Sequence, residues 1–342
     1  MSNKPTFTVF TPTYNRVGPL TRVFASLAVQ TFRDFEWVIV DDGSTDGTEA
    51  QVREWIEQAD FPIRYFWQRN GHKKAAFNRG VREARGTLFL CADSDDAYPP
   101  DALQIFVHQW CNIPESERQR FTGVCGLCVD EQGRLIGDKF PEDVFDSDSL
   151  ELRYRRRVRG EKWGFNRTDV LRDHPFPDML PGYVPEGVIW SRIARSYRTR
   201  FVNRVVRVYF STEDSITVTG TSLKQKRANA FGQAYWAREI LCNQLRWFRF
   251  SPGWFVKAAA NYTRFKLHLS VSAAETLSHL NLDGVTPRIL VIALWPIGVL
   301  RFAVDHFGSI RLRSQPRPET AGAGVSAVRN RDVRPLRGRG GS

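Results

Sequence analysis

The feature that most constrains the fold is a regular alternation of short apolar runs and amphipathic stretches near the N-terminus. Four runs rich in β-branched and aromatic residues predict strands at 6–11, 35–40, 63–67 and 87–92. The stretches between them have helical periodicity, and the clearest places Val52, Trp55, Ile56 and Ala59 on one face. Strands and helices that alternate at this spacing predict an α/β fold with a mostly parallel, Rossmann-like sheet covered on both faces.

Polar segments follow each of the four predicted strands. These segments are "TPTYNR", "DDGSTDGT", "QRNGHKK" and "DSDD", in chain order. Ligands of parallel α/β sheets bind beyond the carboxyl ends of the strands. Four polar endings at one sheet edge exceed what turn formation requires, so the sequence predicts a binding site there.

The fourth ending, in "FLCADSDDAYPP" (89–100), brings together three carboxylates, Asp93, Asp95 and Asp96. They repel one another unless positive charge lies between them, which leaves either a solvated acidic turn or a cation site. Asp93 and Asp95 alternate, so both side chains can point the same way. Mg²⁺ or Mn²⁺ typically takes one or two protein carboxylates and completes its shell with water and phosphate oxygens. We therefore consider a divalent cation that neutralises charge on a leaving diphosphate.

The rest of the chain differs in pattern. Further strands are predicted at 121–130, 134–140 and 200–210, and long aromatic-rich helices after Thr221. The apolar run 289–300 lies between Arg288 and Arg301 and is shorter than the roughly 20 residues of a spanning helix. It is either a buried helix or a monotopic or re-entrant membrane segment. We divide the chain into 1–120, 121–221, a helical and possibly membrane-associated 222–308, and a tail at 309–342.

The net charge of +12 is concentrated in the tail. Residues 311–342 contain eight arginines against Glu319 and Asp332, and their Gly, Pro and Arg content predicts disorder. Such a tail suits nucleic acid, anionic lipid, or no specific partner. The five sparse cysteines and the absence of a basic-then-apolar N-terminus favour a cytoplasmic protein without a secretory signal. The CxxC at Cys125 and Cys128 has no second pair to complete a zinc site.

The segments "FTVFTPTYNR", "WVIVDDGSTDGT", "NGHKKAAFNRGV" and "LCADSDDAYPPD", in this order and spacing, resemble a family 2 glycosyltransferase. The resemblance is strong from residue 6 to about 105 and weaker to about 217. It implies the GT-A nucleotide-diphospho-sugar transferase fold, here with a C-terminal helical extension. It also implies an inverting, hexosyltransferase-like enzyme of polysaccharide or glycolipid synthesis in the cell envelope. The implied donor is a nucleoside-diphosphate sugar, with UDP favoured, and the implied cofactor is Mg²⁺ or Mn²⁺.

The resemblance also implies roles for individual residues. Asp93-Ser94-Asp95 matches the DXD motif, with Asp95 and Asp93 as metal ligands and Asp93 and Ser94 near the donor. One of Asp41 and Asp42 would accept a hydrogen bond from the base, although helix-entry capping is the alternative for this pair. Lysines that open a helix are ordinarily surface residues, and this alternative stays open for Lys73 and Lys74. The implied nucleotide- and donor-binding set also includes Thr11, Pro12, Thr13, Tyr14, Asn15, Arg16, Asn70, Lys74 and Asn78.

An inverting transferase also needs a carboxylate to deprotonate the acceptor hydroxyl. "VPEGVIWSRIA" supplies Glu186 before an apolar helix that contains Arg192, which resembles the acidic motif of the family, with Gly187 where a second acid is common. The alternative for Glu186 is a helix N-terminal glutamate favoured by the dipole. The arginine-rich "RYRRRVRGEKW" (153–163) is either a solvated loop or an acceptor loop for the phosphates of a lipid-linked sugar, with Lys162 and Trp163 as its floor.

Two other functions remain possible. A sugar nucleotidyltransferase would share the sheet and the metal, but we expect a glycine- and arginine-rich first loop in that class, where this chain has "TPTYNR". A non-enzymatic membrane or nucleic-acid adaptor would use the basic tail, but it leaves the four strand-end motifs unexplained. We therefore favour a transferase that works peripherally at the inner face of the membrane on a lipid-linked or polysaccharide acceptor, and we expect no nucleic-acid partner.

Overall fold

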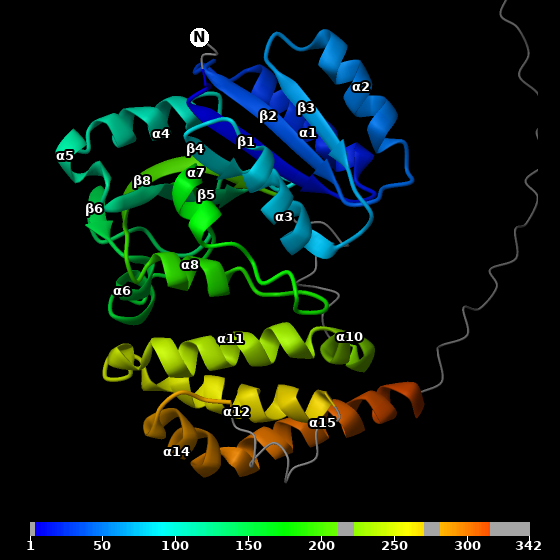
Figure 1. Cartoon of the computed structure of the whole chain (residues 1–342), viewed down its shortest axis with the longest axis vertical. Coiled ribbons are helices and arrows are strands. Elements are labelled where there is room, and N and C mark those ends of the chain that lie inside the picture. Colours follow the sequence, from blue (N-terminus) through cyan, green and yellow to red (C-terminus); the bar gives the residue numbers. More distant parts are fainter. Residues whose placement is uncertain (1–3, 211–221, 270–280, 315–342) are drawn as a thin grey trace, which may run out of the picture.

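An eight-stranded sheet forms the centre of the computed structural model, which describes residues 4–210, 222–269 and 281–314 (Figure 1). The strand order is β3-β2-β1-β4-β7-β5-β8-β6. β1 pairs in parallel with β2 and β4, and β2 with β3, which confirms the predicted parallel arrangement. β7 is antiparallel to β4 and β5, β8 is parallel to β5, and β6 is antiparallel to β8. The strands are β1 (Phe7–Thr13), β2 (Phe35–Asp41), β3 (Ile63–Trp67), β4 (Leu88–Cys91), β5 (Phe121–Asp130), β6 (Val144–Ser147), β7 (Lys162–Arg167) and β8 (Arg198–Tyr209).

Helices cover both faces of the sheet, as the periodicity predicts. On one face, α1 (Val17–Ala28), α2 (Thr48–Gln58) and α4 (Ala102–Cys111) contribute to a core with Val9 and Ile39. On the other face, α3 (His72–Glu83), α7 (Thr168–Asp173) and α8 (Gly187–Ile193) contribute to a core with Phe10, Val38 and Val40. Both faces of β1 and β2 are therefore apolar, because alternate side chains of a strand point to opposite faces. The short helices α5 (Glu115–Arg118) and α6 (Ser149–Tyr154) lie outside these two layers in Figure 1.

Two sequence predictions in the second half are wrong. Residues 134–140 do not form a strand; Leu135 makes an isolated bridge with Val129, and Gly137 turns the chain with a φ of 83°. The arginine-rich loop predicted at 153–163 ends earlier, because Lys162 and Trp163 belong to β7 (Lys162–Arg167), which lies between β4 and β5. β7 buries Trp163 and Phe165, so an alternating strand pattern follows directly after the arginines.

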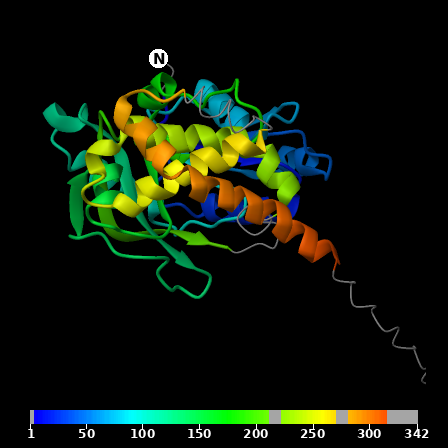
Figure 2. The ribbon, with the colours of Figure 1, turned by 90° about the horizontal axis from the view of Figure 1, so that it is seen from below.

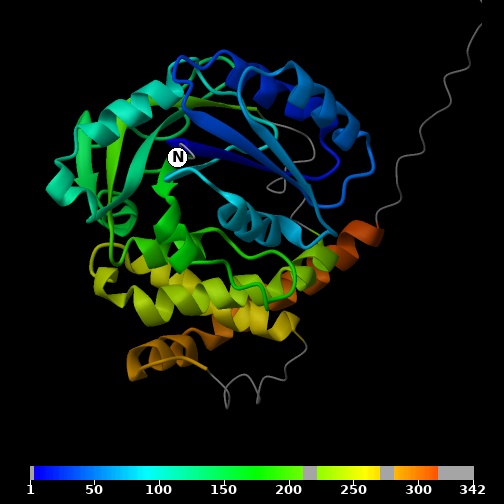
Figure 3. The ribbon, with the colours of Figure 1, turned by 45° about the horizontal axis from the view of Figure 1, so that its top comes forward.

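The C-terminal helices form a separate layer beneath the sheet (Figures 1 and 3). It consists of α10 (Leu223–Ala228), α11 (Ala230–Asn243), the 3₁₀ turn η1 (Leu245–Trp247), α12 (Pro252–His268), α14 (Val285–Ala293) and α15 (Trp295–Ser314). α11 approaches the segment before α8 closely: a Cβ on Gly232 would meet the Tyr183 carbonyl oxygen at 2.0 Å, and one on Gly187 would meet the Trp236 ring at 2.8 Å. The helical layer therefore supports the backbone around Glu186. α15 continues to Ser314, beyond residue 309, where we placed the start of the tail. Residues 315–342 lie outside the described residues.

Candidate active site

A cavity of about 1800 Å³ lies at the carboxyl ends of the strands, with the helical layer on its far side. It is lined by the loop after β1, by the acidic segment after β4, by the segment before α8, and by residues of α11 and α12. The candidate residues that line it are Pro12, Thr13, Tyr14, Asn15, Arg16, Asp42, Asn70, Asp93, Ser94, Asp95, Lys162, Trp163 and Glu186. The structure therefore brings together most of the predicted site from segments far apart in the sequence.

The loop after β1 is held by the loop after β2. Asn15 has a positive φ of 50°; its backbone N–H donates to Ser44 Oγ at 2.8 Å, and its side-chain oxygen accepts from Thr45 N at 2.8 Å. Asp42 accepts from Gln68 Nε2 at 2.7 Å and from Gly71 N at 2.9 Å. These bonds fix the entrance side of the cavity, where Tyr14 is half exposed.

Four candidate residues lie away from the cavity lining. Asp41 is buried and accepts from Ser44 N at 2.7 Å within the turn after β2, and from Tyr65 Oη at 2.6 Å. It does not cap α2, which begins at Thr48 without a side-chain cap. Thr11 accepts from Trp37 Nε1 at 2.9 Å within the core. Lys74 donates to the Leu180 carbonyl, and Asn78 donates to the Phe176 carbonyl at 3.0 Å and to Asp178 at 2.6 Å. The observed role of Lys74 and Asn78 is to hold the segment 176–180.

Arg192 also points away from the cavity. It donates to the hydroxyl of Tyr235 and forms an ion pair with Glu239 of α11 at 3.3 Å. Its observed contacts therefore join α8 to the helical layer, and nothing in them places a phosphate beside it.

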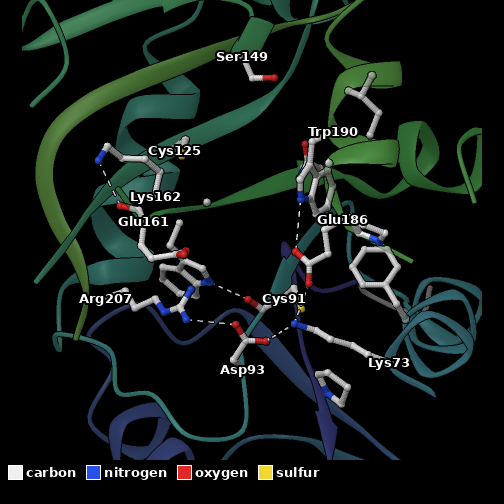
Figure 4. Close-up of a pocket in the computed structure, with 18 of the residues that line it drawn as sticks. Lys73, Cys91, Asp93, Cys125, Ser149, Glu161, Lys162, Glu186, Trp190 and Arg207 are labelled. Carbon is white, nitrogen blue, oxygen red and sulfur yellow. Dashed lines mark hydrogen bonds and ion pairs between the residues drawn. The ribbon is translucent and has the colours of Figure 1, made fainter. Parts of the chain in front are cut away.

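Cations of the chain neutralise the acidic cluster of Asp93, Asp95 and Asp96. Asp93 pairs with Lys73 at 2.7 Å and with Arg207 of β8 at 3.2 Å (Figure 4). Asp95 pairs with Arg16, and the buried Asp96 pairs with Arg207. Burial opposes ionisation of Asp93, but Lys73 and Arg207 outweigh it and lower its pKa to about 2. Burial raises the pKa of Asp96 to about 7, with Arg207 acting in the opposite direction. The repulsion within the cluster is thus relieved by arginine and lysine side chains.

Lys73 connects the acidic cluster to Glu186. Its ammonium lies 2.7 Å from Asp93 Oδ1 and 2.8 Å from Glu186 Oε1, and Trp190 Nε1 donates to Glu186 Oε2 at 3.4 Å (Figure 4). Although burial disfavours its charge, the two carboxylates raise the pKa of Lys73 well above its ordinary value. Glu186 is 39% exposed at its side chain, so it stays accessible to a molecule in the cavity. One cation therefore links the predicted donor side to the predicted base.

Lys162 and Trp163, which we predicted as the floor of an acceptor loop, line the cavity but offer little aromatic surface. Trp163 is 5% exposed, its Nε1 donates to the Cys91 carbonyl at 2.6 Å, and its ring stacks on Tyr98 with centroids 4.4 Å apart. The Lys162 ammonium donates to the Arg159 carbonyl at 2.9 Å. Trp254 of α12 also lines the cavity and is 43% exposed, so it is the better aromatic platform.

Sequence reasoning missed Arg207 and Trp254, and it did not choose Lys73 over Lys74. Arg207 lies in a strand that reads as alternating, where an arginine is ordinarily a solvent-facing residue. The density of arginines in 153–163 did point to the site, because Arg153, Arg157 and Arg159 line the cavity. The conformation of this segment was not predictable, with Arg157 at a φ of 57°.

The residues fit a divalent cation only if the substrate completes its coordination shell. Within 4–210, 222–269 and 281–314, no group of three or more His, Cys, Asp or Glu side chains gathers as a metal site. Both oxygens of Asp93 face cations, whereas Asp95 pairs with Arg16 through Oδ2. Asp95 is thus the better-placed carboxylate ligand, and diphosphate oxygens and water would supply the remainder.

Comparison with known proteins identifies a family domain in the N-terminal part of the chain. Residues 8–117 match the family model described as glycosyl transferase family 2. A GalNAc(5)-diNAcBac-PP-undecaprenol β-1,3-glucosyltransferase of Campylobacter jejuni is 24% identical over 225 residues, covering 63% of this chain and 68% of that protein. An uncharacterized glycosyltransferase of Rickettsia felis is 37% identical over 145 residues, covering 40% of this chain and 23% of that protein. The match spans less than a quarter of the length of the Rickettsia felis protein and of a Rickettsia bellii relative.

Solved structures agree with the fold. S. aureus TarS 1–349 in complex with UDP-GlcNAc has a TM-score of 0.54 at 19% identity, covering 89% of this chain and 92% of that chain. The mannosyltransferase PcManGT from Pyrobaculum calidifontis in complex with GDP-Man and Mn²⁺ has a TM-score of 0.51 at 20% identity, covering 90% of this chain and 84% of that chain. The GT-A fold predicted from the sequence is confirmed. The domain at residues 8–117 of this chain matches glycosyl transferase family 2.

Proposed function

We propose that this protein is an inverting glycosyltransferase that moves a sugar from a nucleoside-diphosphate sugar, with UDP as the favoured nucleotide, to an acceptor hydroxyl. The observation that carries the proposal is the single cavity in which Lys73 joins Asp93, on the donor side, to Glu186. The neighbours bound to UDP-GlcNAc and to GDP-Man support a nucleotide-sugar donor at this sheet edge.

In the proposed reaction, a carboxylate oxygen of Glu186 takes the proton of the acceptor hydroxyl. The acceptor oxygen forms a bond to the anomeric carbon, and the bond from that carbon to the diphosphate oxygen breaks, so the nucleoside diphosphate leaves with the electron pair. Arg16 and Lys73, which line the cavity, supply positive charge near the departing diphosphate. Mg²⁺ or Mn²⁺ held by Asp95, with Asp93 nearby, would supply further neutralisation of the diphosphate.

The proposed acceptor is a lipid-linked saccharide or a growing polysaccharide of the cell envelope, used at the inner face of the membrane. Support comes from the far end of the cavity, which is lined by Arg153, Arg157 and Arg159 and by the exposed ring of Trp254. Arginine forks bind phosphate well, and an aromatic face suits a sugar ring. The Campylobacter relative, named for a polyprenyl-diphosphate-linked substrate, agrees with this acceptor class.

The test is UDP release from a panel of UDP-sugars, with GDP-mannose for comparison, in the presence of Mg²⁺ or Mn²⁺ and lipid-linked or saccharide acceptors. Glu186→Gln should lower transfer at least about 10²-fold with nucleotide binding retained, because the variant keeps the shape of the base but cannot accept the proton. Glu49→Gln, on the exposed surface of α2, is the matched control and should transfer at the wild-type rate. Near-wild-type transfer by Glu186→Gln would show that another residue acts as the general base.

A further inference from the structure

Exposed apolar side chains gather on α14 and α15, and we call this set of side chains the outer apolar face. Its side chains are 46–71% exposed and belong to Val285, Ile289, Ile292, Ile297, Leu300, Val304 and Phe307. Within residues 285–307 the single acidic residue, Asp305, is buried, while Arg288 is exposed and Arg301 is half-buried. This surface is therefore apolar at its centre and carries positive charge without an exposed carboxylate.

The opposite side of these two helices is fixed to α12. A Cβ on Gly298 would meet Thr263 Cβ at 2.5 Å, so α15 lies directly against α12. Asp305 accepts hydrogen bonds from Arg264 at 2.6 and 2.7 Å and lies 2.9 Å from His268 Nε2, and Lys226 of α10 adds a bond at 2.7 Å. α15 is thus fixed along α12, and Figure 2 shows this side of the molecule from below.

This attachment argues against a helix pair that crosses a bilayer. Among the described helices, none is long and apolar enough to span alone; α14 and α15 up to Phe307 pass such a test only together, with a bend of 55° between them. At 1.5 Å per residue the two parts are about 14 and 20 Å long, so neither part alone crosses the roughly 30 Å of hydrocarbon. Spanning would also carry the charged cluster around Asp305 into lipid. An orientation in the membrane plane leaves that cluster on the protein side.

We propose that the outer apolar face docks in the plane of an anionic membrane, with its apolar side chains below the headgroups. The inference rests on the proposed function, because docking would bring the cavity to a membrane that carries the lipid-linked acceptor. Arg288 and Arg301, followed by the net +6 of residues 311–342, match the charge of anionic lipid. A second copy of the chain fits less well, because a symmetric contact would bring the same arginines together with no exposed carboxylate within residues 285–307, and the nearby Asp283 already pairs with Arg238.

The position of this face relates the membrane to the cavity. α12 packs against α14 and α15 on one side and against α11 on the other, and the cavity is lined by Gln233 of α11 and Trp254 of α12. Figure 3 shows α11 and α12 between the sheet and α14. Membrane docking would therefore hold the acceptor end of the cavity at a fixed height above the lipid surface.

The test is flotation of the full chain with vesicles of phosphatidylcholine, with and without phosphatidylglycerol. The wild type should float with the anionic vesicles and less with the neutral ones. Ile292→Glu/Leu300→Glu places two carboxylates on the outer apolar face and should reduce binding at least about tenfold. Ile56→Glu/Trp67→Glu changes two similarly exposed apolar residues on α2 and β3, and should bind as the wild type does.

Several results would overturn the inference: no flotation of the wild type, equal flotation of Ile292→Glu/Leu300→Glu, or equal loss in the control pair. A wild-type dimer that becomes a monomer in Ile292→Glu/Leu300→Glu, without any vesicle binding, would assign the face to a second copy. Circular dichroism checks folding, and Ile292→Gln/Leu300→Gln gives a milder variant with the same expected direction. Vesicle binding without sugar transfer would contradict the proposed function and leave the docking face intact.

Discussion

Replacing Arg207 with methionine removes the cation that lies between two carboxylates of the acidic cluster. The Arg207 side chain is 7% exposed, and its partner Asp96 is fully buried. Methionine keeps much of the apolar volume, so the main change is a buried Asp96 without its ionic partner. Removing one member of a buried pair costs about 3–5 kcal/mol, and we expect a loss at the lower end of this range in the free energy of unfolding near pH 8, because Asp96 can remain protonated there without Arg207.

The loss should be smaller at acid pH. The pKa of Asp96 is raised to about 7, above the ordinary value of 3.8, so between these values the folded chain holds a proton that the unfolded chain has lost. The contribution of Asp96 to stability is therefore greatest below pH 3.8, falls as the pH rises towards 7, and is constant above it. Without Arg207 the pKa rises further. Near pH 5 Asp96 is protonated with or without Arg207. At this pH we expect Arg207→Met to lower the free energy of unfolding by only about 1–2 kcal/mol, because of the lost hydrogen bonds.

The assay is urea unfolding of the wild type and Arg207→Met near pH 5 and near pH 8. Arg207→Met/Asp96→Asn removes both charges and should recover most of the loss near pH 8. Arg200→Met is the matched control on the same strand, because Arg200 pairs with the partly exposed Asp146 at 2.7 Å and has no contact with Asp96. An equal loss at both pH values, with no recovery in the double variant, would refute the reasoning.

Two further predictions concern the neighbouring charges. Lys73→Met should lower kcat about 10–100-fold and raise the donor KM, because Lys73 contacts both Asp93 and Glu186. Lys74→Met should alter thermal stability more than turnover, because Lys74 contacts the Leu180 carbonyl. Equal kinetics in the two variants would contradict this assignment. Asp95→Ala should abolish the gain in UDP affinity on adding Mg²⁺ or Mn²⁺, measured by calorimetry, with an unchanged far-UV spectrum; metal-dependent binding that persists would place the cation elsewhere.

The parallel half of the sheet was predictable because its strands are apolar on both faces. Phe10 and Val9 point to opposite cores, so β1 reads as a continuous apolar run and stands out from the helices around it. β7 was missed for a physical reason. Only Trp163 and Phe165 are deeply buried within its six residues, and it follows five arginines that suggest a loop.

The composition of the site was only partly predictable, because partners depend on side-chain direction. Lys73 and Lys74 are adjacent at the start of α3, yet successive residues of a helix point about 100° apart. Lys73 reaches Asp93 and Glu186 in the cavity, while Lys74 reaches Leu180 on the segment beside it. The sequence pattern is the same for both lysines, so no spacing argument separates them.

The acidic cluster changes in meaning once its partners are known. Three carboxylates in four residues suggest a missing cation, but Arg16, Lys73 and Arg207 already neutralise them. A divalent ion at Asp95 must therefore compete with Arg16 in the absence of nucleotide. A diphosphate changes this competition, because its oxygens offer Arg16 another anionic partner and give the ion further ligands. It follows that metal and donor should bind cooperatively, with weak metal binding to the chain alone, and the calorimetry of Asp95→Ala measures the same coupling.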